Sequence, residues 1–238
     1  MSLFTRFLKH FDDYKRSIDD AQAGEALYAL SDLLAASLCV DNLPLPQQKA
    51  LTIAQIKTIT QHLRSLLESD ENTRGHVDMA LFAVWRALHV NCLDDPDLIS
   101  EEQALKYIEH AHNKKNKFAT FELAQLSSQK WEFAEALAIL NSLEKENFGP
   151  ALFALATEYQ YGNMGVKIDL NQAQTLYTRA LAARLPFHPT TSYEICATLE
   201  LARIANELMR GIYSTATPVG DTSAIGNSVA APLPVPAV

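Results

Sequence analysis

Glycine, proline and cysteine are all scarce in this chain of 238 residues. It has 8 glycines and 10 prolines, and most of the prolines lie outside the segments with apolar periodicity. Because helix breakers are so few and 48% of the residues are hydrophobic, the composition predicts an all-α fold. The 3 cysteines, Cys39, Cys92 and Cys196, lie far apart, which argues against a disulfide framework and predicts free thiols in a reducing compartment.

The chain has fewer basic than acidic residues, and it has no long apolar runs. The formal net charge of -8 argues against nucleic acid as a ligand, because phosphate contacts need clustered Lys and Arg. The one dense basic cluster, Lys114 to Lys117, is expected in a solvated turn between two helices. No apolar run approaches the ~20 residues that span a bilayer, and charges interrupt residues 1–16, where a signal peptide needs an apolar core. We therefore expect a cytoplasmic protein without membrane insertion.

Catalytic motifs are missing as well. The sequence has no Gly-x-Ser-x-Gly, no phosphate-binding glycine loop, no His-Glu-x-x-His and no Cys-x-x-Cys. His89 and Cys92 share a helix face at a spacing of three, but two ligands do not make a metal site. The sequence therefore predicts a protein that is not an enzyme and that holds no metal and no cofactor. The alternative is an all-α enzyme that uses His89 or His188.

A five-residue phrase, Ala-x-Phe-x-aliphatic, occurs three times, at 80–84, 119–123 and 151–155. The copies begin 39 and 32 residues apart, a period typical of stacked helical hairpins. Each copy is followed by a second helix with a small-residue pattern of its own. These patterns are Ala104-x-x-x-Ile108-x-x-Ala111, Ala136-x-x-x-Leu140-x-x-Leu143 and Ala173-x-x-x-Tyr177-x-x-Ala180. Because two helices approach closely only where side chains are small, these alanines are expected to set the helix crossings.

The third copy has a more specific pattern, which extends over residues 151–180. Its members are Ala151, Leu155, Tyr159, Gly162, Gly165, Val166, Asp169, Ala173, Tyr177 and Ala180. This pattern resembles the Sel-one-like repeat, a relative of the tetratricopeptide repeat. Gly162 and Gly165 suit the turn that such a repeat places between its two helices, and Asp169 suits the N-cap of the second helix. Ala156 stands where the family usually has Gly, and the first two copies lack the glycine loop.

Further segments flank the repeats. Residues around 2–17, 24–38 and 47–69 have apolar positions at helical spacing. The aromatic stripe of the first segment either packs on neighbouring helices or docks on a membrane or a partner. From Ser214 onward Thr, Ser, Ala and Pro dominate, which predicts a disordered tail, with a proline-rich docking peptide at 232–236 as the alternative.

Together these features predict an all-α, right-handed α-solenoid of stacked helical hairpins. An N-terminal helical segment, 1–75, is expected to pack on the repeats, which occupy 76–213. The disordered tail then covers 214–238.

The inner face of such a stack, which the first helix of each hairpin builds, is the expected binding surface. When the three copies are aligned, their phenylalanines form one row with polar residues along its edge. The candidate partner-binding residues are Phe82, Arg86, His89, Phe121, Gln125, Phe153, Thr157, Gln160 and Tyr161. An aromatic ladder of this kind holds a peptide or a helix. The alternative is that the phenylalanines fill the core between the repeats.

The predicted function is that of a protein–protein interaction module. As an adaptor, an assembly factor or an antagonist, it would capture a segment of another protein along the concave face of the repeats. A second hypothesis is a bacterial immunity or secretion-accessory protein that occludes a toxin or effector. This hypothesis follows from the resemblance to Sel-one-like proteins, and the acidic charge would suit a basic effector.

Overall fold

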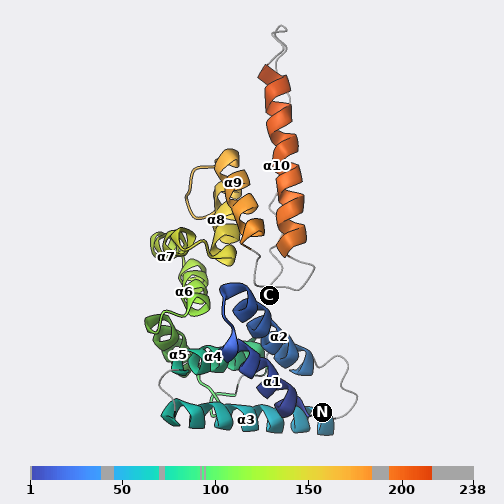
Figure 1. Cartoon of the computed structure of the whole chain (residues 1–238), viewed down its shortest axis with the longest axis vertical. Coiled ribbons are helices and arrows are strands. Elements are labelled where there is room, and N and C mark those ends of the chain that lie inside the picture. Colours follow the sequence, from blue (N-terminus) through green and yellow to red (C-terminus); the bar gives the residue numbers. More distant parts are fainter. Residues whose placement is uncertain are drawn as a thin grey trace.

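The computed structural model describes every residue except 1, 39–45, 70–72, 92, 94, 184–192 and 216–238. This part of the chain forms ten α-helices and no strand, which confirms the all-α fold class. In chain order the helices are α1 (Leu3–Arg16), α2 (Asp20–Leu38), α3 (Pro46–Ser69), α4 (Arg74–Val90), α5 (Glu101–Asn113), α6 (Lys117–Gln129), α7 (Phe133–Lys145), α8 (Gly149–Tyr161), α9 (Leu170–Ala182) and α10 (Tyr193–Thr215). Figure 1 shows α1 to α5 gathered at one end of the molecule, with α6 to α9 extending from them and α10 beside α9.

The first helix buries its aromatic stripe. Ser2 caps the helix, because its hydroxyl accepts a hydrogen bond from the Thr5 N–H at 3.1 Å. Phe7, Phe11 and Tyr14 are each at most 1% exposed, and α1 packs against α2, α3 and α4. Of the two alternatives for this stripe, the structure shows packing on neighbouring helices.

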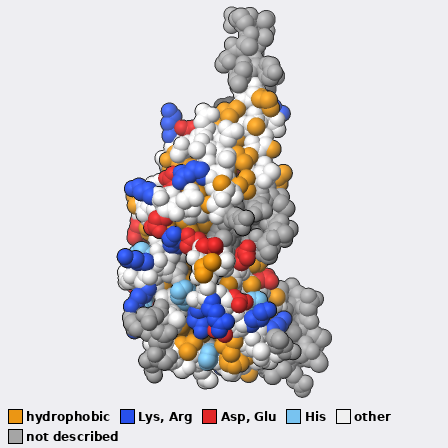
Figure 2. Space-filling model, in the orientation of Figure 1, with side chains coloured by type: hydrophobic (Ala, Val, Ile, Leu, Met, Phe, Trp, Pro, Cys, Tyr) orange, Lys and Arg blue, Asp and Glu red, His pale blue; other side chains and the backbone are white. Residues whose placement is uncertain are grey.

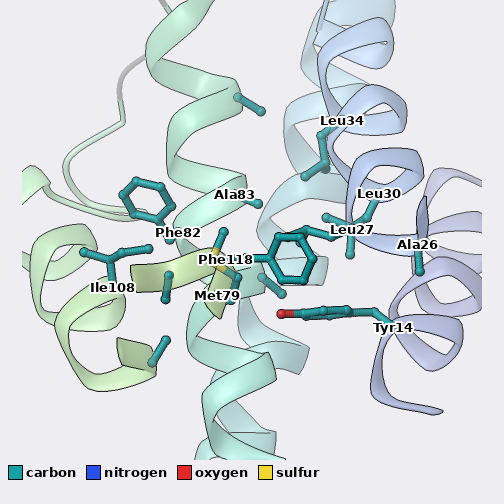
Figure 3. Packing of buried hydrophobic residues seen from close by; sticks show 14 of the residues in the cluster. Tyr14, Ala26, Leu27, Leu30, Leu34, Met79, Phe82, Ala83, Ile108 and Phe118 are labelled. Carbon is teal, nitrogen blue, oxygen red and sulfur yellow. The ribbon is translucent and has the colours of Figure 1, made fainter. Parts of the chain in front are cut away.

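Besides packing on α4, the N-terminal helices contact the start of α6. The Asn116 side chain donates a hydrogen bond to the Tyr14 hydroxyl at 2.7 Å, and the Tyr14 ring lies edge-on to Phe118. Figure 3 shows Tyr14 and Phe118 beside Leu27 and Leu30, which belong to α2. This contact buries apolar surface from α1, α2 and α6 in one cluster.

The basic cluster at 114–117 is divided between two roles. Lys115 lies exposed in the turn between α5 and α6, with a backbone φ of 61°. The Lys117 ammonium contacts the Asp20 carboxylate at 2.8 Å and the Glu146 carboxylate at 3.4 Å. Lys117 therefore links α6 to the N-terminal helices and to the turn before α8.

Four consecutive helices have the same length and the same spacing. α5 to α8 begin at residues 101, 117, 133 and 149, which are 16 residues apart, and each is 13 residues long. Each of the three connections contains one residue with left-handed backbone: Lys115, Trp131 and Asn147, with φ of 61°, 66° and 54°. In every case the N–H of the next residue donates to a carbonyl five residues earlier, at 2.9 to 3.1 Å. The same terminal-carbonyl bond thus closes all three turns.

The small residues of the repeated patterns are all buried. Those with 0% exposure are Ala80, Ala104, Ala111, Ala119, Ala136, Ala151, Ala173 and Ala180. Because these positions lack bulky side chains, the helices pack closely in the pairs α4–α5, α6–α7 and α8–α9. Each pair also packs on the next one through α5–α6, α7–α8 and α9–α10. Neighbours in the chain are therefore neighbours in space.

The connection between α8 and α9 has the geometry that its glycines predict. Gly162 ends α8 in the left-handed conformation with φ of 71°, and Gly165 has φ of 75°. The Asp169 carboxylate accepts a hydrogen bond from the Gln172 N–H at 3.0 Å and so caps α9. Both expectations, for the glycine turn and for the N-cap, are confirmed.

Gly162→Ala and Gly165→Ala should separate backbone strain from close packing. Both variants place a side chain in the left-handed region, at a cost of roughly 1–2 kcal/mol. A Cβ at residue 162 would also come within 3.1 Å of the Ile168 side chain and of the Val166 carbonyl, whereas a Cβ at 165 meets nothing within 4 Å. We expect Gly162→Ala to lower the urea midpoint more than Gly165→Ala does. Equal midpoints for the two variants would contradict the close packing at Gly162.

The last helix extends into the segment that was expected to be a tail. α10 ends at Thr215, so it includes the first two residues of 214–238. Residues 216–238, and with them the proline-rich stretch 232–236, lie outside the described residues. The same holds for Cys39, Cys92 and His188.

Candidate partner-binding surface

The three repeated phenylalanines lie in different environments. Phe82 is only 1% exposed, whereas Phe121 and Phe153 are half-buried. The Phe121 ring lies 6.2 Å from the ring of Phe148, and the Phe153 ring lies 5.4 Å from that of Tyr177, both edge-on. The repeated phenylalanine is therefore buried in α4 and partly exposed to solvent in α6 and α8.

α4 differs from the other two helices because the N-terminal helices cover it. α1, α2 and α3 all pack on α4, in addition to α5. Figure 3 shows Phe82 beside Ile108 of α5 and shows Leu27 and Leu30 of α2 on the opposite side of α4. The Phe82 ring thus lies on the α5 side of α4, while the N-terminal helices cover another side of the same helix (Figure 3).

An ion pair between Arg86 and Glu122 joins α4 to α6, and three of the predicted residues lie within one helical turn of it. We call them the α4–α6 patch: Arg86, His89 and Gln125. Arg86 forms an ion pair with Glu122, whose side chain is 11% exposed. His89 lies one turn further along α4 and stacks on the Trp85 ring at a centroid distance of 5.1 Å. Gln125 is half-buried one turn after Glu122 and therefore lies on the same face of α6.

Two other predicted residues contact α10. Gln160 is 5% exposed, and its amide donates a hydrogen bond to the Glu200 carboxylate at 2.5 Å. Its carbonyl oxygen accepts a hydrogen bond from the Tyr177 hydroxyl at 2.8 Å. The Tyr161 hydroxyl donates to the same Glu200 carboxylate at 3.2 Å and accepts from the Arg203 guanidinium at 2.9 Å. Each of these groups is paired, as buried polar groups must be to avoid a desolvation penalty.

Thr157 completes this network. Its hydroxyl donates to the Phe153 carbonyl at 3.1 Å and lies 3.2 Å from the Tyr177 hydroxyl. The Arg203 guanidinium also lies over the Tyr161 ring, 5.2 Å from its centroid. The structure thus places a helix of the same chain on Gln160 and Tyr161, two of the residues that the third copy contributes to the predicted surface.

The phenols of this network remain hydrogen-bond donors at neutral pH. Burial raises the pKa of the Tyr177 hydroxyl. Burial and the Glu200 charge raise the pKa of the Tyr161 hydroxyl, although the Arg203 charge opposes them. Because both groups stay protonated, they can donate to Gln160 and Glu200 without charge repulsion.

Glu158, on the same helix, is a buried carboxyl group beside the glycine turn. Its carboxylate accepts a hydrogen bond from the Met164 N–H at 3.0 Å and so holds the turn against α8. Burial raises the pKa of the Glu158 carboxyl, and the bond from Met164 opposes this only in part. The native state therefore keeps the proton to a higher pH than the unfolded chain does.

Glu158→Gln should flatten the dependence of stability on pH. The native pKa lies above the unfolded value of about 4.3, so the native state binds more protons in the window between the two, and stability falls as pH rises through it. The amide of Gln still accepts from Met164 but does not titrate. We expect urea midpoints measured between about pH 4 and pH 7 to change less in Glu158→Gln than in the wild type. Glu135→Gln, at an exposed site, should keep the wild-type profile, and parallel profiles for all three proteins would contradict the prediction.

The residues that form hydrogen bonds or ion pairs with the predicted partner-binding residues were not themselves predicted as binding residues. They are Glu122, Tyr177, Glu200 and Arg203. Glu122 stands at a position of the repeated phrase where the other copies have Ala83 and Ala154. This charged residue in an otherwise apolar pattern could have marked Glu122 as a candidate site residue. Glu200 and Arg203 are three residues apart on one helix face, but their sequence spacing does not reveal which helix they meet.

The described part of the chain has no grouping suited to metal binding. Among the described residues, no three His, Cys, Asp or Glu side chains lie close enough together to hold a metal ion. Cys92, the expected companion of His89, lies outside these residues. Within the same part of the chain, no helix has both the length and the apolar character that crossing a bilayer requires.

Comparisons with known proteins give no relative. No family model matches the sequence, and no curated protein or solved structure gives a significant match.

Proposed function

We propose that this chain is a protein–protein interaction module: a right-handed α-solenoid of tetratricopeptide-like hairpins, the third of the Sel-one-like type. Two regularities support this proposal. α5 to α8 repeat every 16 residues with one turn geometry, and the hairpins pack in chain order through buried alanines. Repeats that contact only their neighbours build an extended surface, which is the feature that solenoids use for binding.

The single observation that carries the proposal is the position of α10. α8 already contacts a helix of the same chain, and it does so through Gln160 and Tyr161, two residues of the predicted surface. The groups that α10 presents to it are a carboxylate and a guanidinium, from Glu200 and Arg203. A surface that takes one helix within the chain has the shape and the polar groups to take a similar segment of a partner.

We place the partner on the α4–α6 patch. A guanidinium, an imidazole and an amide lie there within one helical turn of the Arg86–Glu122 ion pair, and each is either half-buried or exposed. These groups suit a peptide segment that offers carboxylates or backbone carbonyls. The chain would then act as a cytoplasmic adaptor, assembly factor or antagonist.

Affinity purification from the native host, with partners identified by mass, tests this function. The informative variant is Gln125→Arg, which adds bulk and charge to the α4–α6 patch. Gln129→Arg is the matched control, because it makes the same change at an exposed position at the end of α6. A partner retained by the wild type and the control but lost by Gln125→Arg supports the proposal. A partner retained equally by all three proteins would contradict this site, and detection of turnover by the purified chain would contradict the function.

A further inference from the structure

A groove runs along the outside of the N-terminal hairpin, between α1 and α2. It consists of two adjoining hollows of about 440 and 330 Å³, which share His10, Glu25 and Ala29. The hollows exist because α2 has small residues on their floor: Ala26, Ala29 and Ala36. Large apolar side chains at these positions would fill the space between the two helices, as they do elsewhere in the core.

The two walls of the groove have opposite charge. Arg6, His10 and Arg16 line it from α1, together with Asp13, whereas α2 contributes the carboxylates of Glu25 and Asp32. Figure 2 shows Lys and Arg side chains, with histidines and carboxylates among them, gathered over the part of the molecule where α1 lies in Figure 1. A surface with one basic wall and one acidic wall is unsuited to a ligand of a single charge sign, such as nucleic acid or an anionic membrane.

The charges on these walls have no ion-pair partners within the described part of the chain. No pair involves Arg6, Arg16, Glu25 or Asp32, although nearby charges on the same hairpin are paired: Lys15 with Asp12 at 2.8 Å and Lys117 with Asp20 at 2.8 Å. The charges of the two walls therefore do not neutralise each other through ion pairs, and a segment that lies over the groove can pair with both walls.

We propose that the α1–α2 groove binds an amphipathic helix of a partner protein, whose apolar stripe has acidic residues along one edge and basic residues along the other. The apolar stripe would rest on the alanine floor and on Leu33 of α2. The acidic edge would face Arg6 and Arg16, and the basic edge would face Glu25 and Asp32. This is the arrangement by which flanking charges select partner and orientation in packed helices. The groove lies on the N-terminal hairpin and does not depend on the repeat surface proposed above.

Three synthetic helical peptides test the groove by fluorescence anisotropy with the full chain. All three have the same Leu/Ala stripe; the first has one Glu edge and one Lys edge, the second two Glu edges and the third two Lys edges. We expect the two-signed peptide to bind at least about tenfold more tightly than either single-signed peptide, because each of those places like charges against one wall. Equal affinities for the three peptides would overturn the proposal.

A charge-reversed variant sharpens the test. Arg6→Glu with Arg16→Glu makes both walls acidic, so this protein should lose the two-signed peptide and gain the peptide with two Lys edges. Lys9→Glu with Lys130→Glu changes the net charge equally at exposed positions outside the groove and should behave as the wild type. Ala36→Trp, which fills one hollow from an exposed position, should weaken all helix binding without lowering the melting temperature. If the reversed variant and its control bind the peptides alike, the groove is not the site.

Discussion

Phe82→Ala should lower the free energy of unfolding by about 3–5 kcal/mol, the usual cost of removing a buried aromatic ring. The Phe82 side chain is 1% exposed on a helix against which α1, α2, α3 and α5 pack, so a cavity left there cannot collapse easily. Phe121→Ala should cost roughly half as much, because Phe121 is half-buried and gives up less transfer free energy. Urea unfolding followed by circular dichroism at 222 nm, the helix band, measures both changes.

The comparison decides what the repeated phenylalanine does in each copy. Phe121→Ala and Phe153→Ala should change partner binding more than they change stability, since both rings remain partly open. Phe82→Ala should do the opposite. If all three variants lose equal stability and bind as the wild type does, the phenylalanines are core in every copy, and the surface must lie elsewhere.

Helix positions were largely predictable from apolar spacing, and the errors at their ends have local causes. The second helix was expected from Gly24, but it begins at Asp20, because the Asp19 carboxylate accepts from the Gln22 N–H at 2.8 Å and caps it. The third begins at Pro46, one residue earlier than expected, since proline is well suited to the first turn of a helix.

The environments of the repeated residues were much less predictable. Nearly identical phrases at 80–84 and 151–155 end in different surroundings, because α1, α2 and α3 pack on the helix that contains the first one. Residues 1–75 show helical periodicity, but periodicity does not reveal which helix they cover. The contact between Gln160 and Glu200 joins residues 40 apart in the chain, and such a pairing depends on how α10 folds back.

Tyr177→Ala should be the second most damaging change, with a loss of about 3–5 kcal/mol. The Tyr177 side chain is 1% exposed between α8 and α9, and its ring contacts Phe153. Tyr177→Phe isolates the hydroxyl from the ring. It leaves the buried Gln160 carbonyl without its donor at 2.8 Å, which should cost about 1–3 kcal/mol.

The hydroxyl of Tyr177 should also affect how stably α10 packs on the repeats. Because the Tyr177 bond fixes the Gln160 amide, its loss frees that amide to turn away from Glu200. Among the described residues of α10, only Ala197 and Ile204 are fully buried apolar side chains. Hydrogen exchange at 196–210 should therefore become faster in Tyr177→Phe, while exchange in α6 stays unchanged.

Tyr159→Phe is the matched control for this experiment, since it removes a hydroxyl from a half-buried tyrosine outside the network. It should leave both stability and exchange in α10 close to those of the wild type. Faster exchange of α10 in Tyr177→Phe alone would mean that the polar network, more than apolar burial, holds this helix on the repeats. In that case a partner that competes for Gln160 and Tyr161 needs to replace only a few hydrogen bonds to displace α10. If exchange in α10 is the same in both variants, the helix is held by its apolar contacts, and the third copy is closed to partners.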